Sequence, residues 1–249
     1  MPRFYIRPEF WDPKNLILCE SESHHCLNVL RLKEGDEVSA FNGQGQEVQT
    51  EIEIAKKGQV QLKESHPIQS SKSKMQIALG QAIPKGKNMD LIIEKSTELG
   101  VSKIYPIISD RSIVRISSNE LLKKQEKWQR VAIEACKQSG QNWLPEVKIP
   151  KKPEELFQFD QLEYDLLLIA SLQKESKHFK EILSEYLGAN DQIEPSSVLM
   201  LIGPEGDFTP SEINLSMNFG FAPMTLGPIV LRSETAALFS LSILSYELS

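Results

Sequence analysis

Residues 199–212, Leu-Met-Leu-Ile-Gly-Pro-Glu-Gly-Asp-Phe-Thr-Pro-Ser-Glu, decide how the C-terminal part of the chain folds. The apolar run Val198–Ile202 predicts a buried strand, which the Gly-Pro-Glu-Gly turn ends. Thr209 then begins a helix, with Pro210 at the first helical position and Glu212 three residues after the cap. A strand, a glycine loop and a capped helix place free backbone amides at the carboxyl edge of a sheet, where a ligand can bind.

A second loop of the same kind follows at residues 226–236, Leu-Gly-Pro-Ile-Val-Leu-Arg-Ser-Glu-Thr-Ala. A tight connection between a strand and a helix explains either loop alone, but two such loops in one domain favour a ligand pocket. Both loops combine a glycine, which allows close backbone approach, with apolar side chains, which suit a flat purine and a thioether. Neither loop has the GxGxxG or P-loop spacing of phosphate-binding turns.

The rest of this region alternates predicted strands and helices. Apolar runs predict strands at Met75–Gly80, Ile104–Ile108 and Asp165–Ala170, and the spacing of apolar residues predicts helices at about Lys87–Leu99, Glu120–Ser139 and Ser233–Leu248. This alternation predicts an α/β domain with a mostly parallel sheet. The last helix is apolar almost all round, so we expect it to be buried against a second surface, such as another subunit.

The N-terminal residues have a different pattern, with short predicted strands separated by turn residues. These strands are Asn15–Cys19, Glu37–Asn42, Val48–Ala55 and Gln59–Lys63, and one helix is predicted at about Ser23–Arg31. The pattern indicates a small β-barrel or curled sheet. The polar run Ser65–Lys74 is the predicted linker, so we divide the chain into domains at 1–70 and 74–249.

The charge of the chain is unevenly distributed. The 249 residues have a net charge of -6, yet residues 74–152 hold 15 basic and 8 acidic side chains, a net charge of +7, and residues 153–249 hold 4 and 15, a net charge of -11. The basic middle segment is either a site for a polyanion or a set of solvated lysine-rich helix faces.

Three cysteines without a CxxC pair make a disulfide framework or a zinc site unexpected. The sequence has no signal peptide and no apolar run of membrane-spanning length, so we expect a cytoplasmic protein without a membrane partner. Glu205 and Asp207 are a close acidic pair with three interpretations: a metal site, acid–base chemistry, or stabilisation of the turn. A turn role is favoured, and no metal is expected.

Motifs along nearly the whole chain, in order, resemble those of the small-subunit ribosomal RNA uridine-N3 methyltransferase family of the SPOUT superfamily. The last two motifs, at their mutual distance, are the most specific. The motifs are Arg3-Phe4-Tyr5, His25 with Val29-Leu30-Arg31 and Gly35-Asp36, Asp90 with 94–101, Arg111-Ser112, Glu134-Ala135-Cys136 with Gln138-Ser139, 201–206, and Leu226-Gly227 with 231–236.

This resemblance implies a PUA-like RNA-binding β-barrel followed by an α/β SPOUT domain with a trefoil knot, a homodimer, and S-adenosylmethionine bound within the knot. The partner it implies is 16S rRNA or the small ribosomal subunit. Arg232 and Glu205 would face the methyl-transfer site. The cofactor pocket would be lined by Leu201, Ile202, Gly203, Pro204, Gly206, Leu226, Gly227, Ile229 and Leu231, and RNA would be held by Arg3, Arg7, Arg31, Lys87, Arg111 and Arg115.

Two positions depart from the family pattern. Asp207 stands where similar proteins usually have a second glycine, and Gln141 stands where they usually have an arginine. We therefore keep two further hypotheses beside the methyltransferase. One is a non-catalytic RNA-binding factor for ribosome assembly, which has lost its cofactor through Asp207, and the other is a metal-dependent hydrolase that uses Glu205 and Asp207.

Overall fold

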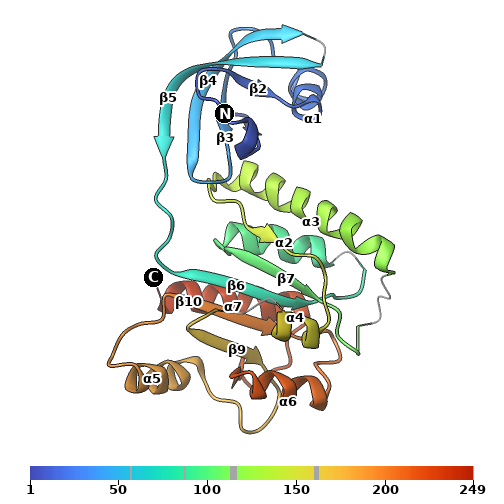
Figure 1. Cartoon of the computed structure of the whole chain (residues 1–249), viewed down its shortest axis with the longest axis vertical. Coiled ribbons are helices and arrows are strands. Elements are labelled where there is room, and N and C mark those ends of the chain that lie inside the picture. The colour runs from blue at the N-terminus through green and yellow to red at the C-terminus, as the bar shows by residue number, and fades with distance from the viewer. Residues whose placement is uncertain (57, 87, 113–116, 160–162, 249) are drawn as a thin grey trace. The chain divides into compact units, whose positions relative to one another are not determined.

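The computed structural model describes residues 1–56, 58–86, 88–112, 117–159 and 163–248. The chain forms two compact units (Figure 1). The first consists of Met1–Lys72 together with Ile133–Leu144, and the second of Ser73–Ala132 together with Pro145–Ser249. The division at residue 72 lies inside the predicted linker. The assignment of 133–144 to the first unit, in contrast, is not anticipated by the division at 70 and 74.

The first unit is built on a five-stranded sheet with the order β1-β3-β4-β5-β2. Its strands are β1 (Arg3–Tyr5), β2 (Leu16–Leu18), β3 (Glu37–Phe41), β4 (Gln46–Lys56) and β5 (Gln59–Gln69). β1 runs parallel to β3, whereas the other neighbours are antiparallel. β1 and β2 are the two ends of this order, and among the described residues no strand pairing joins them, so the closed barrel stays a prediction.

Two N-terminal predictions are corrected. The predicted helix at 23–31 is instead a short α-helix, α1 (Glu20–His24), continued by a π-helical turn, η2 (His25–Val29). A short 3₁₀ turn, η1 (Pro8–Phe10), precedes them. The predicted linker begins too early, because β5 remains paired with β4 as far as Gln69. The end of β5 is polar because it is exposed to solvent, and an exposed polar strand lacks the apolar alternation that predicts a strand.

The second unit contains a six-stranded parallel sheet with the order β11-β9-β10-β6-β7-β8, as predicted for its class. Its strands are β6 (Gln76–Ala82), β7 (Lys103–Ile107), β8 (Glu146–Val147), β9 (Leu166–Ala170), β10 (Ser197–Ile202) and β11 (Ala222–Met224). Its helices are α2 (Asn88–Glu98), α3 (Ser118–Ser139), α4 (Pro153–Phe159), α5 (Phe179–Ala189), α6 (Pro210–Asn218) and α7 (Ser233–Glu247). α3 ends in the segment assigned to the first unit.

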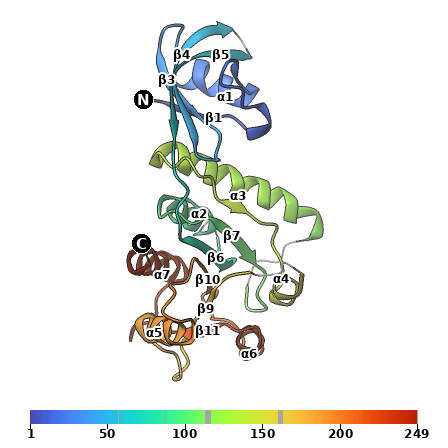
Figure 2. The ribbon, with the colours of Figure 1, turned by 60° about the vertical axis from the view of Figure 1, so that its left-hand side comes forward.

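Helices cover both faces of this parallel sheet (Figure 2). α2 and α7 pack together on one face, and α4 and α6 pack together on the other. Because both faces are covered, the central strand β10 is buried along nearly its whole length, which explains its continuous apolar run. None of the helices in the described ranges combines the length and the apolarity that a membrane crossing needs.

Close backbone packing at the centre of the sheet requires a glycine. Leu201 of β10 lies opposite Gly80 of β6, and a Cβ atom at Gly80 would lie 2.3 Å from Leu201 Cδ2. The Leu201 side chain is therefore directed into the core, where it is 1% exposed.

Candidate functional site

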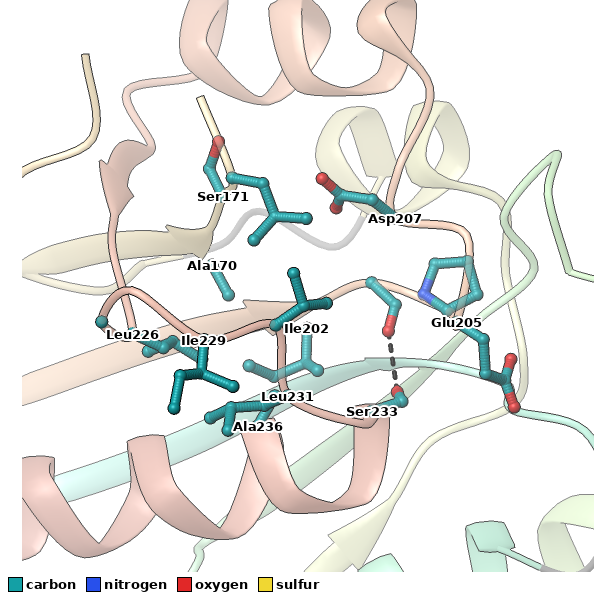
Figure 3. Close-up of a pocket in the computed structure, with 15 residues that line it drawn as sticks. Ala170, Ser171, Ile202, Glu205, Asp207, Leu226, Ile229, Leu231, Ser233 and Ala236 are labelled. Atoms are coloured by element: carbon teal, nitrogen blue, oxygen red, sulfur yellow. Dashed lines mark hydrogen bonds between the residues drawn. The ribbon is translucent and has the colours of Figure 1, made fainter. Parts of the chain in front are cut away.

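An open pocket lies at the carboxyl ends of β9 and β10 and beside the loop that leads from β11 to α7 (Figure 3). The pocket encloses about 550 Å³ of empty space, including its solvent-open part. It is lined by Ala170, Ser171, Leu172, Ile202, Gly203, Pro204, Glu205, Asp207, Leu226, Gly227, Ile229, Val230, Leu231, Ser233 and Ala236. Both glycine loops found in the sequence therefore contribute to one site.

The first loop folds as its sequence predicts. Thr209 caps α6: its Oγ1 accepts a hydrogen bond from the Glu212 amide, and the Glu212 carboxylate accepts one from the Thr209 amide at 2.7 Å. A Cβ atom at Gly203 would lie 3.0 Å from Asp207 Oδ1 and 3.1 Å from the Phe208 amide nitrogen. The loop therefore needs a glycine at 203 because it turns tightly back on itself.

A buried hydrogen-bond chain connects the two loops. Gln81 Nε2 donates to Ser233 Oγ at 2.9 Å, and Ser233 Oγ donates to the carbonyl oxygen of Gly203 at 2.7 Å. Ser233 is the first residue of α7, and Gln81 is fully buried in β6. These two hydrogen bonds connect the start of α7 to the first loop, so they hold the two loops together at this point.

The residues predicted to bind the cofactor divide into those that line this pocket and those that do not. Seven of them line the pocket, namely Ile202, Gly203, Pro204, Leu226, Gly227, Ile229 and Leu231. Leu201 does not, because its side chain packs in the core against Gly80. Gly206 does not either: it lies against the side chain of Arg111, whose Nη1 donates to the Gly206 carbonyl oxygen at 2.7 Å.

The two predicted catalytic residues lie at different positions relative to the pocket. Glu205 lines it, and its Oε1 accepts a hydrogen bond from the backbone amide of Lys85 at 3.1 Å. Arg232 is the exposed N-cap residue of α7, next to the lining residues Leu231 and Ser233. Within the described parts of the chain its guanidinium makes no hydrogen bond or ion pair, so it is available to a ligand.

The third wall of the pocket and part of the other two were not predicted from the sequence. The missed residues are Ala170, Ser171, Leu172, Asp207, Val230, Ser233 and Ala236. The first three lie at the end of β9, which was a predicted strand. Because parallel strands end at one carboxyl edge of the sheet, their position at the end of this strand indicates that they lie near the pocket. Asp207 was noted only as a departure from the family pattern and as half of an acidic pair.

Asp207 has the left-handed backbone conformation that glycine usually takes, with φ at 59°. Aspartate is one of the few other residues that tolerate this region. Its Oδ1 accepts a hydrogen bond from the Phe208 amide at 2.8 Å. Burial raises the pKa of the Asp207 carboxyl, against the opposing effects of that hydrogen bond and of the positive charge of Arg111.

The arginines expected to contact RNA have different environments. Arg3 is bonded within the first unit, where its Nη1 donates to the Cys136 carbonyl oxygen at 2.5 Å and its Nε lies 3.4 Å from Glu47 Oε1, and its contact with RNA stays a prediction. Arg7 and Arg31 are exposed. Arg111 supports the first loop of the pocket. Lys87 and Arg115 lie outside the described residues.

No metal site is found in the described ranges, because no three His, Cys, Asp or Glu side chains there gather closely enough to hold an ion. In particular, Glu205 and Asp207 have no third acidic, histidine or cysteine partner of this kind among those residues.

Comparisons with known proteins agree with this architecture. A family model described as an RNA methyltransferase domain matches residues 71–245, and one described as an RNA methyltransferase PUA domain matches residues 18–65. The chain is 30% identical over 255 residues to the ribosomal RNA small subunit methyltransferase E of Bacillus subtilis, covering 99% of this chain and 97% of that protein.

Two solved structures are similar over nearly the whole chain. A methyltransferase from Legionella pneumophila, in complex with its bound cofactor SAM, has a TM-score of 0.87 and 34% identity and covers 98% of this chain and 97% of its own. The ribosomal RNA small subunit methyltransferase E of Neisseria gonorrhoeae, bound to S-adenosyl methionine, has a TM-score of 0.85 and 30% identity. The match covers 99% of this chain and 98% of that one.

Proposed function

Because this chain belongs to the RNA methyltransferase family, we propose that it is an S-adenosylmethionine-dependent methyltransferase that modifies N3 of a uridine in the 16S RNA of the small ribosomal subunit. The observation that carries this proposal is the convergence of both glycine loops on one pocket. Similar chains that were solved with S-adenosylmethionine support the identity of the cofactor.

The residues of the pocket fit this cofactor. Ile202, Leu226, Ile229 and Leu231 provide apolar surface for an adenine ring, and the glycines allow close approach to the backbone. Glu205 and Asp207 provide negative charge opposite a cationic ligand. When bound, S-adenosylmethionine supplies a methyl group activated by its positively charged sulfur.

Arg232 stabilises the negative charge that develops on the uracil ring. Removal of the N3 proton spreads charge onto the two flanking carbonyl oxygens, and a guanidinium is always protonated and can donate two hydrogen bonds to such oxygens. The exposed Arg232 side chain at the start of α7 is free to do so. Glu205, fixed through Oε1 by the Lys85 amide, is our candidate acceptor of the N3 proton, with solvent as the alternative.

We assign RNA binding to the first unit and to the basic segment 74–152. Arg7 and Arg31 are exposed on the first unit, whose residues 18–65 match the PUA model. Phosphate contacts act locally, so a segment with a net charge of +7 can bind RNA even though the whole chain is acidic. Since ribosomal RNA is the substrate, we place the protein in the cytoplasm.

We further propose a homodimer and a C-terminal trefoil knot. Large apolar side chains remain exposed near the pocket and on α7, among them Val230 at 71% and Phe239 at 44%. Apolar surface of this kind favours a protein partner. The knot is supported by the strand order β9-β10-β6, which places strands distant in sequence side by side, and by the second loop lying against the first.

The direct test is to incubate the protein with labelled S-adenosylmethionine and either small ribosomal subunits or naked 16S RNA from cells that lack this gene. We expect label at N3 of one uridine, located by mass spectrometry of RNA fragments. Label on another atom contradicts the N3 assignment. RNA binding without methylation, together with no cofactor-induced rise in melting temperature, supports the non-catalytic assembly factor instead.

A further inference from the structure

The pocket has an unbalanced charge. Its described lining residues include two acids, Glu205 and Asp207, but no lysine, arginine or histidine. Burial raises the pKa of Asp207, and the positive charge of Arg111 opposes this shift. Arg111 is not among the lining residues, and its Nη1 donates to the carbonyl oxygens of Gly206 and, more weakly, Phe208. A ligand in the pocket therefore faces negative side chains.

Asp207 is held in a defined place in the pocket wall. Its backbone is left-handed, its Oδ1 accepts a hydrogen bond from the Phe208 amide at 2.8 Å, and the same oxygen packs against Gly203. Figure 3 shows the Asp207 carboxylate directed towards the side of the pocket where Ser171 lies.

We propose that Asp207 is a specificity-determining residue that makes the pocket prefer the cationic methyl donor over its neutral product. This inference rests on the proposed function and concerns the same site. S-adenosylmethionine carries a positively charged sulfur, and S-adenosylhomocysteine, which remains after transfer, carries an uncharged thioether. The two ligands share every other group, so a fixed negative charge in the wall acts on the difference between them.

The charge of Asp207 matters here because the residue is partly buried. In water the interaction between two unit charges a few ångströms apart is weak, but it strengthens several-fold at the lower effective dielectric constant of a partly buried site. Arg111 and solvent offset part of this field. We therefore expect the Asp207 charge to favour the donor over the product by about five- to tenfold.

The consequence for the enzyme is easier release of the product. A family pattern with glycine at this position lacks this carboxylate. Glu205 contributes to the negative potential as well, but one of its oxygens is occupied by the Lys85 amide, and we assign it to proton transfer. Asp207 is therefore the position at which charge can be removed without removing a proposed catalytic group.

The test is isothermal titration calorimetry of the full chain with S-adenosylmethionine and with S-adenosylhomocysteine. Asp207→Asn removes the charge while retaining an oxygen for the Phe208 amide and tolerance of the left-handed backbone. Asp207→Gly removes the whole side chain without backbone strain. Glu175→Gln is the matched control, since it removes one acid from the exposed loop that follows β9, outside the pocket.

In both Asp207 variants we expect the affinity for S-adenosylmethionine, relative to that for S-adenosylhomocysteine, to fall by about five- to tenfold. In Glu175→Gln this relative affinity should stay within twofold of the wild-type value. In wild type the preference for the donor should also weaken as ionic strength rises. An unchanged relative affinity in Asp207→Asn and Asp207→Gly, with both ligands still bound, overturns this inference alone. Failure of wild type to bind either ligand overturns the proposed function together with it.

Discussion

The Arg3 cluster of the first unit and the pocket of the second unit both hold charged side chains partly out of water, but they pair those charges differently. Arg3 interacts with Glu47, with the Cys136 carbonyl and with Asn142, and its guanidinium stacks 4.3 Å from the ring centre of Phe41. In the pocket, Asp207 and Glu205 accept hydrogen bonds from backbone amides and, among the described residues, have no ion pair.

The difference separates structural charges from charges that serve a ligand. The Arg3 cluster joins β1 and β4 to the segment 133–144, whose place in the first unit depends on these contacts. Its positive charge is used within the chain. The acids of the pocket and the guanidinium of Arg232 have no ion-pair partner among the described residues, so they can interact with a bound molecule. Substitutions of Arg3, Arg232 and Asp207 test this distinction, and a substitution of Gly203 tests the wall of the pocket.

The largest effect is expected in the paired cluster. Arg3→Met leaves the partly buried Glu47 without its cation, so the free energy of unfolding should fall by about 2–4 kcal/mol, whereas the dissociation constant for S-adenosylmethionine should change less than about twofold. Urea denaturation and calorimetric titration measure the two quantities. Arg7→Met, at an exposed arginine, is the control and should cost less than about 0.5 kcal/mol. Equal losses in the two variants would remove the structural role of Arg3.

Arg232→Ala tests the unpaired cation. Its side chain makes no capping hydrogen bond, so α7 should persist while turnover falls by about 10²–10³-fold, the usual effect of losing one donor to a developing negative charge. Steady-state methylation of small subunits and cofactor titration separate the two effects. Arg130→Ala, at an exposed arginine of α3, is the control. If cofactor affinity falls as much as turnover, Arg232 binds the cofactor and the catalytic assignment fails.

Gly203→Val tests the tight wall of the pocket. The new side chain must displace Asp207 or the Phe208 amide, which lie 3.0 and 3.1 Å from a Cβ atom at this position. We expect cofactor affinity to fall by about 10- to 100-fold. Gly188→Val makes the same change in an exposed part of α5 with no heavy atom within 4 Å, and it should leave affinity unaltered. Normal binding by Gly203→Val would exclude residue 203 from the cofactor site.

The fold could be predicted from the sequence wherever one element has a clear pattern. The continuous apolar runs at 165–170 and 198–202 indicated buried parallel strands, and the structure contains them as β9 and β10. The short elements β8 and α4 were missed because two or seven residues give too few periods to recognise. The segment 133–144 belongs to the first unit through long-range contacts with Arg3 and Ser70, which no local pattern encodes.

The site was predictable to the extent that it is made of loops with their own motifs. Seven of the nine expected lining residues are in the pocket, and in the first loop the chain turns tightly back on Gly203. Leu201 was misplaced because a fully buried strand gives no alternation to indicate which residues face the ligand. The link through Gln81 was missed because it joins residues 152 positions apart.

The smallest effect is expected for Asp207, the unpaired acid, and concerns the folding stability of the protein. Burial raises the pKa of Asp207 above its usual 3.8, so the folded protein holds this proton more tightly than the unfolded chain. The free energy of unfolding therefore falls as the pH rises through the interval between 3.8 and the raised pKa. The protein remains destabilised by the same amount at neutral pH. Asp207→Asn should raise the melting temperature of the ligand-free protein at pH 7.5 by about 1–2 °C.

This gain should shrink as the pH is lowered and vanish below 3.8, where the wild-type carboxyl is protonated in both states. Thermal scans across this pH range provide the measurement. A melting temperature that falls at pH 7.5 in Asp207→Asn would show that the carboxylate is stabilising, as in the Arg3 cluster.

The most direct test of the account is a crystal structure of this chain with S-adenosylmethionine. We expect the adenosyl group to lie between residues 203–207 and 226–231, with its sulfur on the side of Glu205 and Asp207. A well-ordered cofactor bound anywhere else, with these two loops empty, would contradict the account.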